Sequence, residues 1–283
     1  MKRRLISQRD SLTITLPKDW ITFKNLKPGD EIDISQSGEV LMLNSLSNKK
    51  KKEFELEIST LNDECIRNTL NSLYVCGATK LILRSDKPSK LLLCKKLTSL
   101  FLVGFEVSEE YKGEIALEAL AISDSTNLEN YFDKIWNILD SDFKILKGED
   151  FGDKADISEE IKRGTKKLTQ YCNICDRILL ETIYNDSQKA IKLRIIQNLK
   201  EINHLIFHLF EKKDKVSKEM AEVLEEIFLS IRRGYFKEEI ESINKSQELI
   251  NKNLKKLENN IFLFSISREL YRLSNSVLGV IFK

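Results

Sequence analysis

The chain has 283 residues, of which 41% are hydrophobic and 32% charged, and its net charge is +2. This composition is ordinary for a folded, partly helical protein of two or three domains, and the net charge alone gives no argument for nucleic-acid binding. No apolar run approaches the length of about 18 residues that a membrane span needs. The chain starts without the apolar core of a signal peptide, and its five cysteines lack framework spacing, so we expect a soluble, cytoplasmic protein.

The first 45 residues alternate between apolar and polar side chains in short runs. Residues 11–16 are predicted to form a strand with one solvated face, which Pro17 ends because proline cannot donate to a strand ladder. Residues 18–23 suit a single helical turn, and residues 31–34 and 40–43 suit two further strands. So short a segment cannot bury enough apolar surface by itself, and we expect it to pair with a second copy.

Positive charge concentrates at the same end of the chain. Residues 1–52 hold eleven basic and six acidic side chains, a net charge of +5, whereas the remainder carries −3. We interpret the lysine run at 49–52 as a solvated linker. The other basic residues flank the predicted strand, and Thr13 lies on its polar face with a hydroxyl free for phosphate or base edges. Charge alone leaves open that Lys2, Arg3 and Arg4 are solubilising terminal residues. Combined with the motifs described below, the candidate DNA-contacting residues are Lys2, Arg3, Arg4, Arg9, Thr13 and Lys18.

Residues 53–124 switch between alternating and helical spacing. The predicted order is strand, helix, strand, helix, strand, strand, which is typical of a small α/β sandwich with its helices on one face of the sheet. These elements are expected at residues 54–58, 61–77, 79–84, 89–102, 105–107 and 115–122. The segment has no phosphate-binding glycine motif, nucleophile elbow or metal-ligand spacing. A spacer, a dimerisation unit and a ligand sensor all remain open as its role.

Residues 127–283 show helical periodicity throughout, with predicted breaks that include Gly148 and Gly234. Six helices are expected, at residues 127–147, 156–185, 187–212, 215–234, 237–257 and 260–282. Helices of this length with short connections form two three-helix bundles. The predicted fold class is therefore multidomain, α+β followed by all-α, with domains at 1–48, 53–124 and 127–283.

Two spaced motifs in the N-terminal domain resemble a known family. They are Leu16-Pro17-Lys18-Asp19-Trp20 and Leu26-Lys27-Pro28-Gly29-Asp30-Glu31-Ile32, which follow the basic residues. This pattern is similar to that of SpoVT/AbrB-type swapped-hairpin DNA-binding domains. The version nearest to this chain usually has Gly-Gly-Ser before the strand, where this chain has Gln8-Arg9-Asp10-Ser11. The resemblance implies an intertwined homodimer of hairpins that binds double-stranded DNA.

The helical domain resembles PhoU, the helical regulator of phosphate uptake. The resemblance is carried by residues 127–136, 175–180 and 193–204, and residues 271–275 echo the last stretch. In archaeal members a SpoVT/AbrB domain precedes PhoU, and this order extends the resemblance over nearly the whole chain. It implies a transcription regulator linked to phosphate uptake and phosphate homeostasis, with a phosphate transporter or signalling protein as a further partner.

PhoU repeats that hold metal clusters place carboxylates on facing helices, so that several converge on iron or zinc. Asp176 keeps one of these positions, but Lys200 and His204 occupy two others, and Tyr271 and Asn275 occupy their counterparts in the second repeat. An ammonium and a phenol cannot replace carboxylates in a hard oxygen site. We therefore expect no metal cluster and no other cofactor.

Two smaller arrangements also contain ligand-forming residues. His204 and His208 lie one turn apart with Glu201 on the same face, and together with Asp176 they could bind zinc. The helix is apolar and no further anchor is evident, so packing is the expected role of both histidines. The Cys-x-x-Cys at 172–175 lies inside a helix, without the second pair that zinc needs or the helix N-terminus that a redox pair needs.

Three classes of function follow. The first is a dimeric DNA-binding regulator whose helical half senses or relays phosphate status. The second is a PhoU-like adaptor that modulates a phosphate transporter or signalling partner without binding DNA. The third is an enzyme, for which the chain lacks paired carboxylates and has only two histidines for acid–base work. We expect the first, and salt-sensitive duplex binding by residues 1–52 separates it from the second.

Overall fold

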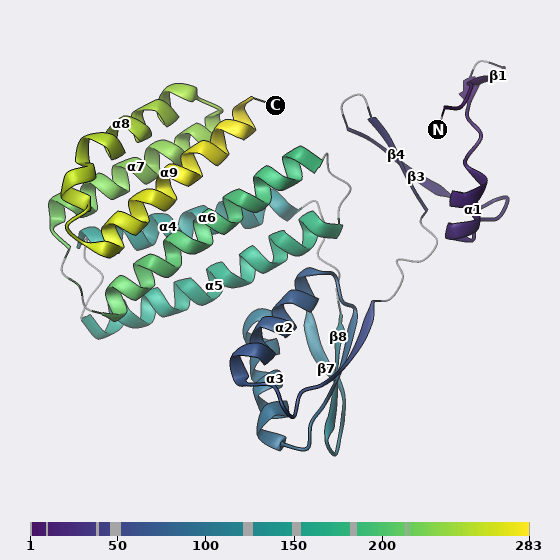
Figure 1. Ribbon diagram of the computed structural model, residues 1–283, viewed down its shortest axis with the longest axis horizontal. Helices are drawn as coiled ribbons and strands as arrows, with labels where there is room; N and C mark the ends of the chain where they lie inside the picture. The colour runs from purple at the N-terminus through teal and green to yellow at the C-terminus, as the bar shows by residue number, and fades with distance from the viewer. Residues whose placement is uncertain are drawn as a thin grey trace. The chain divides into compact units, whose positions relative to one another are not determined.

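The computed structural model describes residues 2–9, 11–37, 40–45, 52–120, 127–148, 154–181, 186–212, 214 and 216–282. They belong to two compact units, residues 1–51 and 52–283 (Figure 1). The first unit is a small β region, and the second contains a mixed sheet with helices followed by a helical bundle. The layout is thus α+β followed by all-α, in the order that the sequence predicts.

Within its described residues, the first unit has two antiparallel hairpins and one short helix. Its elements are β1 (Ile6–Gln8), β2 (Ser11–Thr13), α1 (Lys18–Lys24), β3 (Ile32–Ser37) and β4 (Val40–Ser45). β1 pairs with β2, and β3 pairs with β4. The helix and the second hairpin lie where the sequence pattern predicts them. β1 is not predicted, because three residues are too few to reveal an alternation.

The strand expected at 11–16 is shorter than predicted. β2 ends at Thr13, which pairs with Ile6, the first residue of β1. Residues after Thr13 therefore have no residue of β1 with which to pair. Pro17 is extended, with φ −62° and ψ 132°, and it precedes the first residue of α1 rather than closing the strand.

The turn before β3 explains the spacing of the second motif. Gly29 has φ +97°, a backbone conformation that glycine adopts readily. Lys27 N–H donates to Asp30 Oδ2 at 2.7 Å, and Asp30 N–H donates to the Lys27 carbonyl at 3.1 Å. The two hydrogen bonds close the turn, so these residue types serve the local backbone geometry.

The second unit opens with a four-stranded sheet and two helices. The elements are β5 (Glu53–Glu57), α2 (Asp63–Val75), β6 (Lys80–Arg84), α3 (Pro88–Phe101), β7 (Phe105–Tyr111) and β8 (Glu114–Ala119). The strand order is β5-β6-β8-β7, with β5 parallel to β6 and the other pairs antiparallel. This is the predicted element order. The Asn62 side chain caps α2 by accepting from Cys65 N–H at 2.8 Å, and Pro88 lies in the first turn of α3.

The two faces of this sheet differ in character. α2 and α3 lie on the same side of it (Figure 1), and the side chains of Leu81, Leu83 and Leu117 are fully buried in the core between sheet and helices. On β6, Lys80 and Arg84 alternate with Leu81 and Leu83, and each forms ion pairs with two glutamates on other strands of the sheet. The opposite face of the sheet is therefore a charged surface.

A lysine on α3 holds the loop that leads from β5 into α2. Lys90 Nζ donates to the backbone carbonyls of Ile58 at 3.2 Å and Ser59 at 2.6 Å, and also to that of Leu61. The loop continues directly into Asn62, the cap of α2. One ammonium thus contacts three carbonyl groups of this loop, of which that of Ser59 also accepts from Lys87 Nζ at 3.2 Å.

The described part of residues 127–282 contains six helices, close to the predicted ranges. They are α4 (Leu128–Lys147), α5 (Lys154–Glu181), α6 (Asp186–Glu211), α7 (Lys218–Lys237), α8 (Ile240–Leu257) and α9 (Ile261–Ile281). α4 to α6 pack together, as do α7 to α9, and α6 also contacts α9 while α4 contacts α7. All six contribute to one continuous core that includes Phe132, Trp136, Leu199 and Leu270.

The predicted helix break at Gly234 is wrong. α7 runs through this residue to Lys237, and the chain turns at Glu238, which has φ +54°. A Cβ atom at position 234 would lie 2.4 Å from Ile243 Cδ1 on α8. Glycine is present here because the two helices approach closely, and not because the helix ends.

α5 joins the helical bundle to the α/β part of the second unit. Asn173 Nδ2 donates to Asn71 Oδ1 on α2 at 2.5 Å, and Gln170 Nε2 donates to the Leu100 carbonyl on α3 at 2.7 Å. These hydrogen bonds connect the helical bundle to the two helices that cover the sheet.

Arg177 extends this junction into the core. Its side chain, only 3% exposed, lies 3.2 Å from Glu181 Oε1. One of its amino groups donates to the Tyr74 carbonyl at 3.0 Å, and the guanidinium lies 4.9 Å from the Tyr74 ring centroid and 5.5 Å from that of Phe105. A buried, paired guanidinium that stacks on aromatic rings fixes the position of α5 on α2.

Candidate functional site

The basic residues predicted to contact DNA lie in the first half of the first unit. Lys2, Arg3 and Arg4 belong to the segment before β1, Arg9 follows β1, and Lys18 is the first residue of α1. All five side chains are exposed. None of them forms a hydrogen bond or ion pair with a residue that the structure describes. Their charges are therefore available to a partner.

Arg9 occupies the tip of the first hairpin. Gln8 pairs with Ser11, so two residues connect the strands, and Arg9 has φ +54°. Two-residue hairpin turns use positive φ angles, which cost a non-glycine residue roughly 1 kcal/mol. Ser11 Oγ donates to the Gln8 carbonyl at 3.0 Å and supports the turn. A cation thus stands at a turn position that favours glycine.

The expectation that the Thr13 hydroxyl is free is wrong. Thr13 Oγ1 donates to the Ile6 carbonyl at 3.2 Å, across the hairpin. Phosphate oxygens only accept hydrogen bonds at neutral pH, so this hydroxyl has no proton left for a phosphate contact. Its lone pairs can still accept from a base amino group.

The first unit has no core of its own among the residues that the structure describes, since no side chain described in it is buried. Leu12 is 65% exposed, Phe23 71% and Leu41 66%. The other exposed apolar side chains of this unit are Leu5, Ile6, Ile14, Ile34 and Leu43. Apolar side chains exposed at this density mark a surface that associates with another surface.

The candidate metal positions do not converge. Burial raises the pKa of Asp176 to about 6, against the opposing effect of the nearby Lys200 ammonium. Lys200 and His204 line a cavity of 430 Å³ between α2, α3, α5 and α6. On α9, Tyr271 is exposed, and Asn275 accepts a hydrogen bond from a glutamine on α8 at 3.1 Å. Within the described ranges, no three His, Cys, Asp or Glu side chains group as a metal ion requires.

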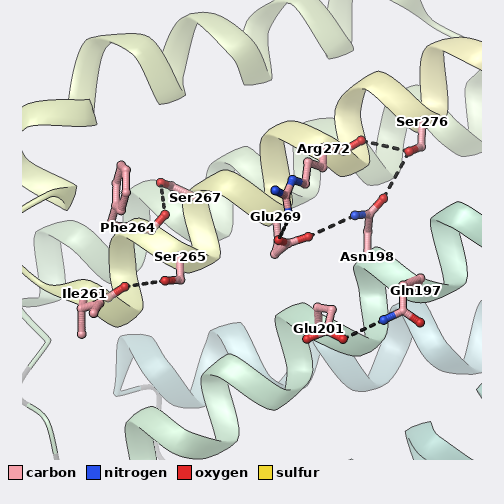
Figure 2. A network of polar contacts seen from close by, with 10 residues as sticks. All are labelled: Gln197, Asn198, Glu201, Ile261, Phe264, Ser265, Ser267, Glu269, Arg272 and Ser276. Carbon is pink, nitrogen blue, oxygen red and sulfur yellow. Dashed lines mark hydrogen bonds and ion pairs between the residues drawn. The ribbon is translucent and has the colours of Figure 1, made fainter.

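Amides and hydroxyl groups connect α6 to α9 (Figure 2). Asn198 Nδ2 donates to Glu269 Oε2 at 3.1 Å, and Ser276 Oγ donates to Asn198 Oδ1 at 3.2 Å. Glu269 is also paired with Arg272 at 2.5 Å, so its charge is already balanced. The network aligns the two helices, and its carboxylate is used within the protein.

The two histidines do not share the packing role that the sequence predicts for both. Their ring centroids lie 6.5 Å apart. His208 is exposed, and its Nδ1 lies 3.2 Å from Glu211 Oε2. His204 is half-buried, and burial lowers its pKa, with Glu201 acting in the opposite direction.

The cysteine pair at 172–175 belongs to the core. Cys172 and Cys175 are fully buried, and burial raises the pKa of both thiols far above the usual value. Thiols that stay protonated are poor nucleophiles and poor metal ligands. Their contribution is packing.

Asp142 is a buried acid that the sequence pattern does not single out. It lies on α4 and is 2% exposed, and it accepts a hydrogen bond from Asn203 Nδ2 at 2.7 Å. Burial raises its pKa to about 7, with a smaller contribution from Glu160, while the hydrogen bond from Asn203 lowers it. This carboxyl therefore titrates near neutral pH.

Comparison with known proteins supplies no relative. No family model, curated protein or solved structure matches the chain. No helix in the described residues is long and apolar enough to cross a membrane. The functional argument therefore rests on the chain's own residues and their geometry.

Proposed function

We propose that the chain is a dimeric, DNA-binding transcription regulator, with a SpoVT/AbrB-type N-terminal domain and a PhoU-type helical domain, linked to phosphate uptake and phosphate homeostasis. One observation carries the proposal. The first unit combines unpaired, exposed cations with exposed apolar strands and has no described buried side chain.

The apolar side chains support the dimer. Leu12 from the first hairpin and Ile34 and Leu41 from the second would otherwise leave most of their hydrophobic surface in water. Each such side chain gains about 1.5–3 kcal/mol on complete burial. A second copy offers the same apolar strands, and a two-fold arrangement makes the contact self-complementary.

The cations support the DNA contact. In a two-fold dimer each of Lys2, Arg3, Arg4, Arg9 and Lys18 appears twice, so a modest charge per chain becomes a substantial patch. Lysine and arginine side chains that neutralise phosphates release counterions, which makes duplex affinity depend steeply on salt. Arg9, at the tip of a hairpin, is the residue placed best to reach into a groove.

The test measures binding of the full-length protein to a fluorescent mixed-sequence duplex at several salt concentrations. In the triple variant Arg3→Ala, Arg4→Ala, Arg9→Ala, we expect weaker binding to every sequence. We also expect the salt slope to flatten by about one unit for each phosphate that the variant no longer neutralises. Exposed charges contribute little to stability, so the variant should fold.

A matched triple variant controls for net charge. Lys112, Lys252 and Lys255 are exposed, lie outside the first unit and form no hydrogen bond or ion pair with a described residue. Replacing these three with alanine should leave duplex binding unchanged. Equal effects of the two triple variants would contradict the DNA-contact assignment, and a wild-type protein that binds no duplex at any salt would favour the adaptor function instead.

A further inference from the structure

The cavity between α2, α3, α5 and α6 lies within the second unit, at the junction of its α/β and helical parts. Its volume of 430 Å³ falls within the range of about 300–1,000 Å³ that is usual for small-molecule sites. Its walls come from segments far apart in the sequence, since α2 and α6 both line it.

The polar lining is strongly cationic. Arg67 from α2, Lys162 and Lys166 from α5, and Lys200 from α6 all line the cavity together with His204, and none of the described lining residues is acidic. This excess is not a consequence of composition, because residues 53–283 carry a net charge of −3. Four like charges around one cavity repel one another, and a bound anion relieves that repulsion.

Most of these cations have no partner in the described part of the chain. Arg67, Lys166 and Lys200 form no hydrogen bond or ion pair with a described residue. Lys162 forms one long contact, 3.6 Å to Glu159, and both of these side chains are exposed. Two further acids act at a distance, Asp176 on Lys200 and Glu201 on His204, which leaves the cavity with a net positive charge.

The rest of the lining is apolar. Leu70, Leu97, Leu102, Phe101 and Phe207 contribute to the walls, and they come from both structural parts. An inorganic ion would leave this surface uncovered. A ligand with an apolar body would cover it, at a gain of about 25 cal/mol for each Å² buried.

One wall residue has an unused polar atom. Thr165 Oγ1 is buried and has no hydrogen-bond partner among the described residues. Helical threonines usually donate to the carbonyl four residues earlier, as Thr169 does to Thr165 at 2.9 Å. A buried hydroxyl without a partner costs about 1–3 kcal/mol, but water does not reach this oxygen, so a ligand oxygen would contact it only after a small shift of the wall.

We propose that this cavity binds a small organic phosphate, a molecule with an apolar body whose phosphate group contacts Arg67, Lys166 and Lys200 while the body lies against the leucine and phenylalanine side chains. A phosphate monoester carries a charge between about −1.5 and −2 at pH 7, which suits several cations better than a single carboxylate does. The ligand would bridge α2 to α5 and α6. This inference rests on the cavity alone and does not depend on DNA binding.

Pyridoxal 5′-phosphate is a suitable probe, because it combines an aromatic ring, a phosphate and an aldehyde. The aldehyde condenses with a nearby lysine amine, releasing water, and added borohydride reduces the resulting imine to a stable secondary amine. Peptide mass spectrometry of the full-length protein then locates the label. At low probe concentration we expect labelling of Lys166 or Lys200 to exceed the mean of the other lysines by at least about tenfold. Labelling spread over the lysines according to their exposure would overturn the proposal.

Competitors that protect the cavity lysines from labelling test the phosphate group and the apolar body of the ligand separately. Pyridoxine 5′-phosphate lacks the aldehyde but keeps ring and phosphate, pyridoxine lacks the phosphate, and inorganic phosphate lacks the ring. We expect the first to protect the cavity lysines at a concentration at least about tenfold lower than the other two. Equal protection by inorganic phosphate would show that the apolar body is not recognised, and equal protection by pyridoxine would show that the cations are not; either result would overturn the proposal.

A variant on the opposite wall provides the second measurement. Arg67 is exposed and has no partner among the described residues, so Arg67→Ala should fold as the wild type does. It should nevertheless reduce labelling of the cavity lysines on α5 and α6 by about tenfold, the loss expected for a hydrogen bond to a charged group. Lys252→Ala, which removes an equal charge far along the chain, should leave the labelling unchanged. Labelling in Arg67→Ala equal to that of the wild type would refute a shared site.

Discussion

Asp142 makes the stability of the helical bundle depend on pH in an unusual direction. Its pKa is 3.8 before burial and about 7 in the folded protein, so the folded state holds the proton more tightly. The stabilisation is complete below pH 4 and disappears as the pH rises through 7. Asp142→Asn cannot ionise and keeps a similar shape. The difference in free energy of unfolding between this variant and the wild type should increase by about 3 kcal/mol from pH 5 to pH 8, in favour of the variant.

Urea unfolding at several pH values measures this difference. Trp20→Phe in both proteins leaves Trp136, which is fully buried in the bundle core, as the fluorescent reporter. Groups other than Asp142 titrate alike in the two proteins and cancel in the comparison. Asp133→Asn, at an exposed position on the same helix, controls for loss of an acid. If the unfolding free energies of Asp142→Asn and wild type stay parallel between pH 5 and pH 8, the carboxyl is not buried as described.

Three further outcomes follow from packing and charge. Gly234→Ala should lower the free energy of unfolding by about 1–3 kcal/mol, because the added methyl group overpacks against α8. The control is Gly164→Ala, whose Cβ would meet no atom closer than 3.5 Å. It should be neutral or slightly stabilising in the same urea titration. Arg177→Ala should cost about 1–3 kcal/mol, measured in the same way, because it leaves the buried Tyr74 carbonyl without its donor and removes the ion pair with Glu181. Elemental analysis of purified protein should find no stoichiometric iron or zinc, since no three His, Cys, Asp or Glu side chains in the described ranges group as a metal ion requires; a ratio near one metal per chain would contradict this.

The regular elements could be predicted because each carries its signal locally. The helix with Leu199 repeats apolar residues at helical spacing, and Pro88 marks a helix start by its missing N–H. The helix end predicted at Gly234 was wrong because the reason for this glycine is not local. A glycine in a helical pattern suggests a stop, and only the neighbouring helix, through Ile243, reveals that it permits a close approach.

The candidate sites were predictable only where their residues are neighbours in sequence. The basic residues around the first hairpin form one short segment, so their grouping is visible without a structure. The hydrogen bond of the Thr13 hydroxyl could not be predicted, because its acceptor is the carbonyl of Ile6, which lies on a strand too short to predict. The cationic cavity has no motif at all, since Arg67, Lys166 and Lys200 stand on three helices and meet only through the packing of α5 against α2 and α3.

The lysine that holds the loop after β5 has a consequence for covalent modification. Acetylation of Lys90 would remove the ammonium that three backbone carbonyls share. The loop ends at Asn62, which caps α2. Arg67 lies on the same helix, within its first two turns. Loss of one positive charge on α3 would therefore loosen the start of α2 and displace a cavity wall residue. A single acyl group could thus alter the shape of the cavity without touching it.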